Sequence, residues 1–202
     1  AINRANAVIK KMPDTDIDQK LKDQYLGEAY FLRAYNYFCL SRNFGLVPLH
    51  DSVVATLSQT GTPLAQNMDE IYDLTIEDCK KAEELLPVYT APTMGRIDRV
   101  GAQALLAKIY LYAASAKSNN VPLYKERNKD VNTMYENAAT YDGRVLGVDP
   151  EYTQNTYGFE NDLLSIYDVE NFAGKENLFL MAMDRTGESE GQYSKISKMF
   201  LP

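Results

Sequence analysis

Residues 27–49, GEAYFLRAYNYFCLSRNFGLVPL, contain the stretch that decides the fold. From Ala29 to Leu40 the pattern is helical and apolar on nearly every side. A helix that is apolar all round has to be covered on all sides by other elements. The sequence therefore predicts a long central helix over about residues 17–42, with Gly45 as its C-cap and an extended exit at Pro48.

Four further helices are expected around this central one. Apolar residues recur at spacings of three and four, and candidate caps such as Asn67 and Asp98 precede two of the periodic runs. The predicted ranges are 2–9, 67–86, 98–117 and 130–146. Polar loops are expected at 51–66, 88–97, 119–128 and 150–160, with a short helix at 161–167 and a buried strand at 178–183.

The order of these elements indicates the fold class. Paired helices with small residues and tyrosines between them are typical of stacked helical repeats. We predict an all-α, irregular tetratricopeptide-like helical repeat with minor strand and loop content near the C-terminus. Residues 1–202 are expected to form one domain of a longer chain. The predicted core contains Leu32, Tyr35, Phe38, Leu74, Leu86, Leu105 and Ile109.

Composition excludes several classes of function. The formal net charge is −7, which disfavours binding to nucleic acid or to anionic lipid headgroups. No run of eighteen apolar residues is present to span a bilayer. His50 is the single histidine, and the scattered acidic residues do not match a calcium loop. We therefore expect no metal and no cofactor.

Two charged residues, Glu28 and Arg33, lie within the apolar helix. Residues five apart point about 140° away from each other on a helix, so these two are not expected to pair. An unpaired buried charge is costly, and each is expected to be neutralised from another helix. Asp78 and Asp98 are the candidate partners for Arg33. A catalytic role for Glu28 would require a positioned partner, and none is visible.

Five segments of the chain resemble the SusD/RagB family in the order in which that family has them. The central helix carries Gly27-Glu28-Ala29, Phe31-Leu32-Arg33-Ala34, Tyr37-Phe38 and Phe44-Gly45, which resemble the family's signature helix. The other segments lie before and after this helix. They are Ala5-Asn6 with Val8-Ile9; Ile71-Tyr72 through Leu86-Pro87; Gly95-Arg96 through Tyr110-Leu111; and Glu176-Asn177-Leu178-Phe179.

This resemblance implies a function at the cell surface. Members of the family are lipoproteins on the outer surface of Bacteroidetes-type bacteria. They bind glycans or other nutrients and cap a TonB-dependent transporter of the SusC type. The resemblance thus implies an outer-membrane protein that contacts the membrane only through an N-terminal lipid anchor, which lies outside this sequence.

Candidate ligand-binding residues are sought on the loops, because rigid elements often present binding residues there. Sugars stack on exposed aromatic rings, and we expect Tyr124, Tyr152, Tyr157 and Asn155 to contact ligand. The helical tyrosines are expected to serve packing instead.

Two other functions stay open at this point. One is a tetratricopeptide-type module for protein–protein interaction, which the acidic composition and the long loops disfavour. The other is a glycan-active enzyme, which would need paired carboxylates on a rigid site. No such pair occurs at a convincing spacing, and the chain is therefore predicted not to be an enzyme.

Overall fold

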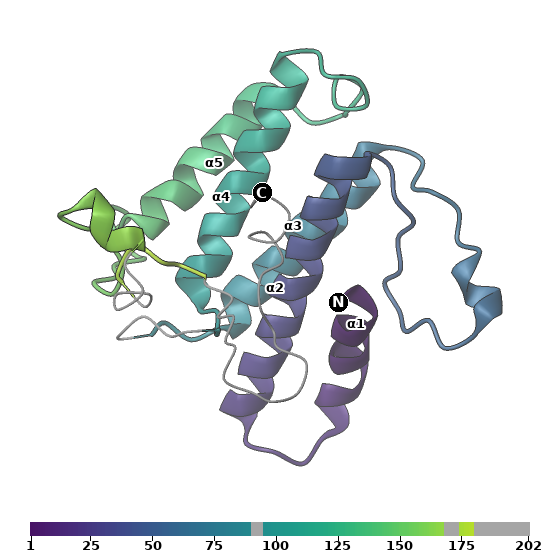
Figure 1. Cartoon of the computed structure of the whole chain (residues 1–202), viewed down its shortest axis with the longest axis horizontal. Helices are drawn as coiled ribbons and strands as arrows, with labels where there is room; N and C mark the ends of the chain where they lie inside the picture. The colour runs from purple at the N-terminus through teal and green to yellow at the C-terminus, as the bar shows by residue number, and fades with distance from the viewer. Residues whose placement is uncertain (90–94, 168–173, 180–202) are drawn as a thin grey trace, which may run out of the picture.

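The computed structural model describes residues 1–89, 95–167 and 174–179, and it is helical throughout its core. Consecutive helices run in opposite directions and pack on one another in chain order (Figure 1). This arrangement confirms the predicted all-α class. The α-helices are α1 Ile2–Lys11, α2 Gln19–Phe44, α3 Met68–Leu85, α4 Arg99–Ser118 and α5 Val131–Val145. Short 3₁₀ helices are η1 Met12–Asp14, η2 Leu57–Thr60 and η3 Leu163–Tyr167.

Side-chain caps set where the longer helices begin. The carboxylate or amide oxygen of the residue before each helix accepts a hydrogen bond from a backbone N–H in the first turn. These capping residues are Asp18 before α2, Asn67 before α3, Asp98 before α4 and Asp130 before α5. At the other end of α2, Gly45 has a φ of +74°, a conformation that a residue with a Cβ rarely adopts.

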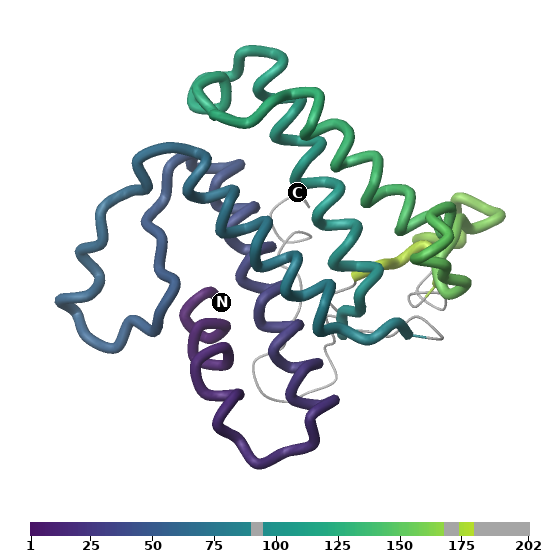
Figure 2. Tube along the Cα trace, turned by 180° about the vertical axis from the view of Figure 1, so that it is seen from behind, coloured from purple at the N-terminus to yellow at the C-terminus, as the bar shows by residue number. Residues whose placement is uncertain are grey.

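The hydrophobic core surrounds α2, and most of the residues that were predicted to form it are buried or partly buried. Phe38, Leu86, Leu105 and Ile109 are buried, and Tyr35 and Leu74 are partly buried against them. The prediction for Leu32 is wrong, because its side chain is 41% exposed. Leu32 lines a groove between α1 and α2, two helices that lie side by side in Figure 2.

Four aromatic rings form the centre of the core. Phe38 of α2, Tyr72 of α3, Tyr112 of α4 and Tyr124 of the α4–α5 connection meet edge to face, with ring centroids 5.7–6.3 Å apart. The hydroxyl groups of Tyr72 and Tyr124 are 3.1 Å apart and share a hydrogen bond. Edge-to-face contacts of this kind add to the free energy gained from burying the rings.

The connection between α2 and α3 projects from the helical body (Figure 1). An antiparallel bridge between Pro48 and Leu64 closes its base, and the amide of Ala65 donates to the carbonyl of Val47 at 3.1 Å. Near the C-terminus, Leu178 and Phe179 lie in a bend and not in the predicted strand, while 180–183 fall outside the described residues. In the described ranges, no helix combines the length and the apolar character needed to cross a membrane.

Candidate functional site

A cavity of about 430 Å³ lies where the loop after α5 meets residues 175–178. Its size is within the usual range for small-molecule sites. Val145 and Leu146 come from the end of α5 and the residue after it, and the loop supplies aromatic side chains. We call this cavity the Tyr157 pocket. Its other lining residues are Val148, Gln154, Tyr157, Gly158, Phe159, Lys175, Glu176 and Leu178.

Gln154 holds the loop of the Tyr157 pocket in place. Its side-chain nitrogen donates to the carbonyls of Val145 (2.7 Å) and Tyr157 (3.2 Å). Its side-chain oxygen accepts from the amides of Thr156 (3.0 Å) and Tyr157 (2.8 Å). One amide side chain thereby satisfies four backbone groups, so the ring of Tyr157 is presented from a fixed backbone.

A second set of hydrogen bonds joins the two segments that close the pocket. The amide of Gly158 donates to the carbonyl of Lys175 at 3.1 Å. The amide of Glu160 donates to the Glu176 carboxylate at 2.9 Å, and the amide of Lys175 donates to the Glu160 carboxylate at 3.0 Å. These contacts place the exposed ring of Phe159 at the pocket, a residue that the sequence analysis missed. The sequence did contain a signal for Phe159, because it is an aromatic residue in the loop 150–160, which was predicted to bind ligand.

Tyr157 is partly buried, and its hydroxyl group is held by Asp98. Burial raises the pKa of Tyr157, and the charge and hydrogen bond of Asp98 raise it further. The phenol is therefore protonated at neutral pH. Because Asp98 also caps α4 through the amide of Gly101 (3.1 Å), Tyr157 is anchored to the helical body.

Tyr152 and Asn155 belong to the same loop but do not line the pocket. The guanidinium carbon of Arg144 lies 4.0 Å from the centroid of the Tyr152 ring and 4.8 Å from that of Tyr141. One face of Tyr152 is therefore covered by a cation that also pairs with Glu83 at 2.8 Å. Asn155 is exposed, with its side chain available to solvent.

The expectation that Tyr124 offers an exposed ring is wrong. Its side chain is 5% exposed and completes the aromatic group with Phe38, Tyr72 and Tyr112. The polar loop around it suggested a surface position, yet its ring turns inward and bonds to the Tyr72 hydroxyl. Of the four predicted residues, the structure places only Tyr157 in the pocket.

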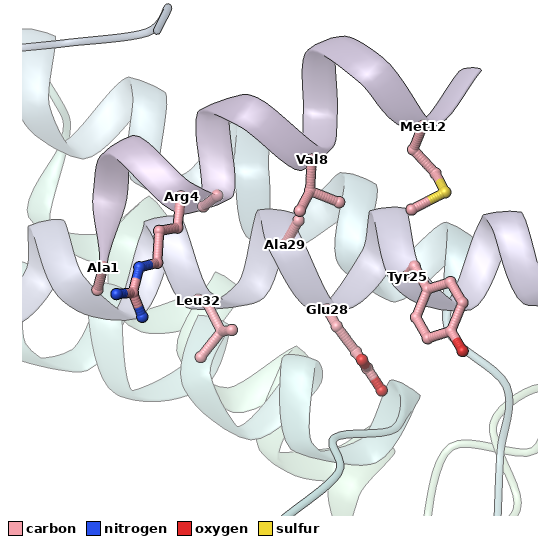
Figure 3. Close-up of a pocket in the computed structure, with 9 residues that line it drawn as sticks. Ala1, Arg4, Val8, Met12, Tyr25, Glu28, Ala29 and Leu32 are labelled. Carbon is pink, nitrogen blue, oxygen red and sulfur yellow. The ribbon is translucent and has the colours of Figure 1, made fainter. Parts of the chain in front are cut away.

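A larger groove of about 530 Å³ runs between α1 and α2 (Figure 3). Its floor is apolar, with Val8 and Met12 facing Ala29 and Leu32. Tyr25 and Glu28 project from α2 along its edge (Figure 3). Glu28 pairs with Arg96 at 2.7 Å, and burial raises the pKa of its carboxyl while Arg96 lowers it in part. This groove offers few polar groups for a sugar, and nothing in the sequence pattern pointed to it.

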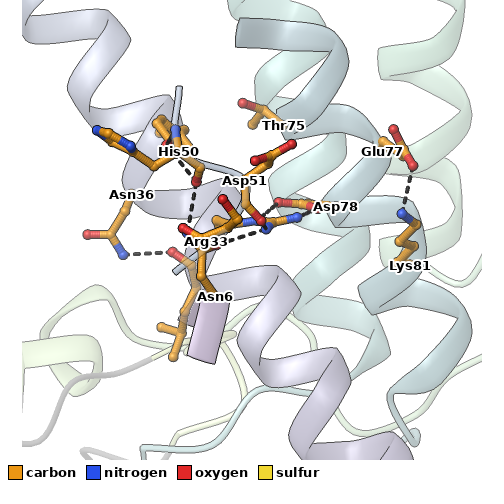
Figure 4. Close-up of polar contacts among 12 residues, drawn as sticks. Asn6, Arg33, Asn36, His50, Asp51, Thr75, Glu77, Asp78 and Lys81 are labelled. Carbon is orange, nitrogen blue, oxygen red and sulfur yellow. Dashed lines mark hydrogen bonds and ion pairs between the residues drawn. The ribbon is translucent and has the colours of Figure 1, made fainter. Parts of the chain in front are cut away.

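The buried pair of Arg33 and Asp78 connects three helices and the α2–α3 connection (Figure 4). Two nitrogens of Arg33 donate to the two carboxylate oxygens of Asp78 at 2.6 and 2.7 Å. A nitrogen of Arg33 also donates to Asn6 at 2.8 Å and to the carbonyl of Asp51 at 3.1 Å. Both members of the ion pair are buried, and Asp78 is therefore the one of the two candidate partners that neutralises Arg33. This cluster is structural, because its hydrogen bonds are used internally.

Among the described residues, no group of three or more His, Cys, Asp or Glu side chains is placed to hold a metal ion. Cys39 and Cys79 are free, and Cys79 is fully buried.

Comparison with known proteins gives one consistent family. Residues 1–111 match a family model described as SusD-like, starch-binding and associating with the outer membrane. Two curated proteins of Formosa agariphila are similar in sequence. SusD-like protein P38 is 32% identical over 122 residues, and SusD-like protein P2 is 26% identical over 179 residues. The matches cover 60% and 88% of this chain, but 23% and 31% of those proteins.

Solved structures agree with the fold. A laminarin-binding SusD-like protein is 25% identical with a TM-score of 0.67, and the match covers 88% of this chain and 34% of that one. A SusD-like protein of Bacteroides fragilis is 24% identical with a TM-score of 0.69, covering 94% and 32%. This chain thus spans about a third of the length of these structures.

Proposed function

Because this chain belongs to the SusD-like family of starch-binding, outer-membrane-associated proteins, we propose that it binds a glycan at the outer surface of the cell. It then delivers this ligand to a TonB-dependent transporter of the SusC type. The observation that carries the proposal is the family match over residues 1–111, which includes the central helix α2. The name of the laminarin-binding relative supports a carbohydrate as the ligand.

Within this chain, the Tyr157 pocket is the proposed place of contact. Its apolar lining and the rings of Tyr157 and Phe159 suit the C–H faces of a sugar. The amide of Asn155, exposed on the same loop, supplies a hydrogen bond to a hydroxyl group. Tyr152, on the same loop but outside the pocket lining, is proposed as a further contact, and Tyr124 is left out because it is buried.

The proposed activity is binding without turnover. Glycoside hydrolysis generally needs two carboxylates that flank the scissile bond. Among the residues that the structure describes, Glu176 supplies the one carboxylate that lines the Tyr157 pocket, and it accepts a hydrogen bond from the amide of Glu160. This arrangement supports a binding protein that releases its ligand unchanged to the transporter.

The proposed location follows from the family. A lipid anchor at the N-terminus of the full-length protein would hold it on the outer leaflet of the outer membrane. The acidic charge of the chain is compatible with this, because no basic face is needed to dock on anionic headgroups.

Substitution of the pocket aromatics tests the site. In Tyr157→Ala and Phe159→Ala, we expect binding of starch or laminarin to weaken roughly three- to tenfold per ring, the loss typical of one aromatic contact. Retardation in a polysaccharide affinity gel measures this. Phe159 is 74% exposed, so its substitution leaves folding intact even if Tyr157→Ala does not.

The matched control is Tyr167→Ala, because the Tyr167 side chain is 78% exposed and does not line the pocket. This variant should bind like wild type. If Phe159→Ala and a folded Tyr157→Ala both bind like wild type, the pocket is not the glycan site.

A further inference from the structure

A polar groove of about 470 Å³ lies between α3 and α5, on a face that the Tyr157 pocket does not use. Both helices pack against α4, which separates them and contributes Tyr110 to the groove. The α3 side chains that line the groove are three or four residues apart, so they share one face of the helix. The α3 residues are Asp73, Ile76, Glu77 and Lys80, and the α5 residues are Thr133, Met134 and Asn137.

The groove retains hydrogen-bonding groups that the fold does not use. In the described part of the chain, the ammonium of Lys80 forms no ion pair and no hydrogen bond, and it is exposed. Asn137 donates to the carbonyl of Thr133 at 2.9 Å, which leaves its side-chain oxygen as an acceptor. Ile76, which is partly buried, adds apolar surface to the same groove. The groove thus offers a donor, an acceptor and an apolar contact.

The charges that line the groove cancel. Three acidic side chains, Asp73, Glu77 and Asp130, face three basic ones, Lys80, Arg127 and Lys129. Asp73 and Lys129 pair at 3.2 Å, and Glu77 is paired with Lys81 at 2.6 Å. Because the charges balance, the groove gives no net attraction to a strongly anionic or cationic ligand. The groove is suited to an uncharged ligand with many hydroxyl groups, each of which both donates and accepts.

The end wall of the groove is held rigidly. The side chain of Arg127 is 1% exposed, pairs with Asp69 at 2.7 Å, and lies over the Tyr72 ring at 4.4 Å. The amide of Asn128 donates to the same carboxylate at 2.7 Å, and Lys117 donates to the carbonyl of Lys129 at 2.8 Å. A ligand would therefore meet preformed backbone here, which lowers the entropic cost of binding.

From this geometry we propose that the α3–α5 groove is a second subsite for a neutral saccharide, separate from the Tyr157 pocket. The proposal rests on the glycan-binding function above and adds a site to it. Two subsites on one protein strengthen the retention of a polysaccharide, because the second contact is made at high effective concentration.

The test removes the unused polar groups of the groove. The double variant Lys80→Ala/Asn137→Ala loses two hydrogen-bonding side chains at the helix surface, and we expect starch or laminarin to bind about five- to fiftyfold more weakly. The matched control Lys108→Ala/Asn132→Ala changes the same residue types at exposed positions outside the groove. This control should bind like wild type, and circular dichroism checks that both variants fold.

A second variant blocks the groove without removing its lysine. Asn137→Trp fills the space and should weaken binding, whereas Glu136→Trp, on the exposed surface one residue earlier, should not. If wild type binds but both groove variants bind equally well, the subsite is refuted and the proposed function stands. If wild type binds no neutral polysaccharide, both the subsite and the proposed function are overturned.

Discussion

Replacing Asp78 by alanine is expected to lower the free energy of unfolding by about 3–5 kcal/mol, the usual cost of leaving one member of a buried ion pair without its partner. Arg33 would lose both short bonds to the carboxylate while staying buried between α2 and α3. The contact that holds the α2–α3 connection at Asp51 would weaken with it. Urea denaturation followed by circular dichroism measures the change.

A matched carboxylate on the same helix provides the control. Asp73 is exposed and pairs with Lys129 at 3.2 Å, so Asp73→Ala should cost about 0–1 kcal/mol. A double variant, Arg33→Met/Asp78→Leu, should be more stable than Asp78→Ala, because no buried charge is left unpaired. Equal losses for Asp78→Ala and Asp73→Ala would contradict the structural role given to the buried pair.

A loss of comparable size is expected for Phe38→Ala, about 3–5 kcal/mol for a fully buried phenylalanine. The ring is 2% exposed and meets Tyr72 and Tyr112 edge to face. Its removal would leave a cavity at the junction of α2, α3 and α4. Thermal and urea unfolding of the variant measure the loss.

Phe44→Ala is the control for this variant, since Phe44 lies at the end of the same helix and is 75% exposed. Its substitution should change stability by less than about 0.5 kcal/mol. If Phe38→Ala costs less than about 1 kcal/mol, Phe38 lies at the periphery and α2 is not the central helix.

Much of the fold could be predicted because its signals are local. Helical periodicity gave the five helices, and Asn67 and Asp98 marked where α3 and α4 begin. The cost of burying a lone charge in an apolar helix predicted a partner for Arg33, and Asp78 was one of two candidates. Each of these inferences needs only neighbouring residues and the free energy of burial.

What the sequence missed depends on contacts between distant segments. Leu32 is apolar like its neighbours, but it lines the groove that α1 and α2 leave between them. Tyr124 lies in a polar loop, and its burial depends on the ring of Tyr72, fifty-two residues earlier. The pockets likewise form between elements far apart in the chain, such as Phe159 and Lys175 in the Tyr157 pocket.

The central claim, glycan binding without turnover, is tested most directly with the protein at its full natural length. It should be run in affinity gels containing starch, laminarin or other neutral polysaccharides, and the same mixtures should be assayed for newly formed reducing ends. We expect retardation by at least one neutral polysaccharide, with no reducing ends above background. Migration unaffected by every polysaccharide, or product formed over many turnovers, would contradict the account.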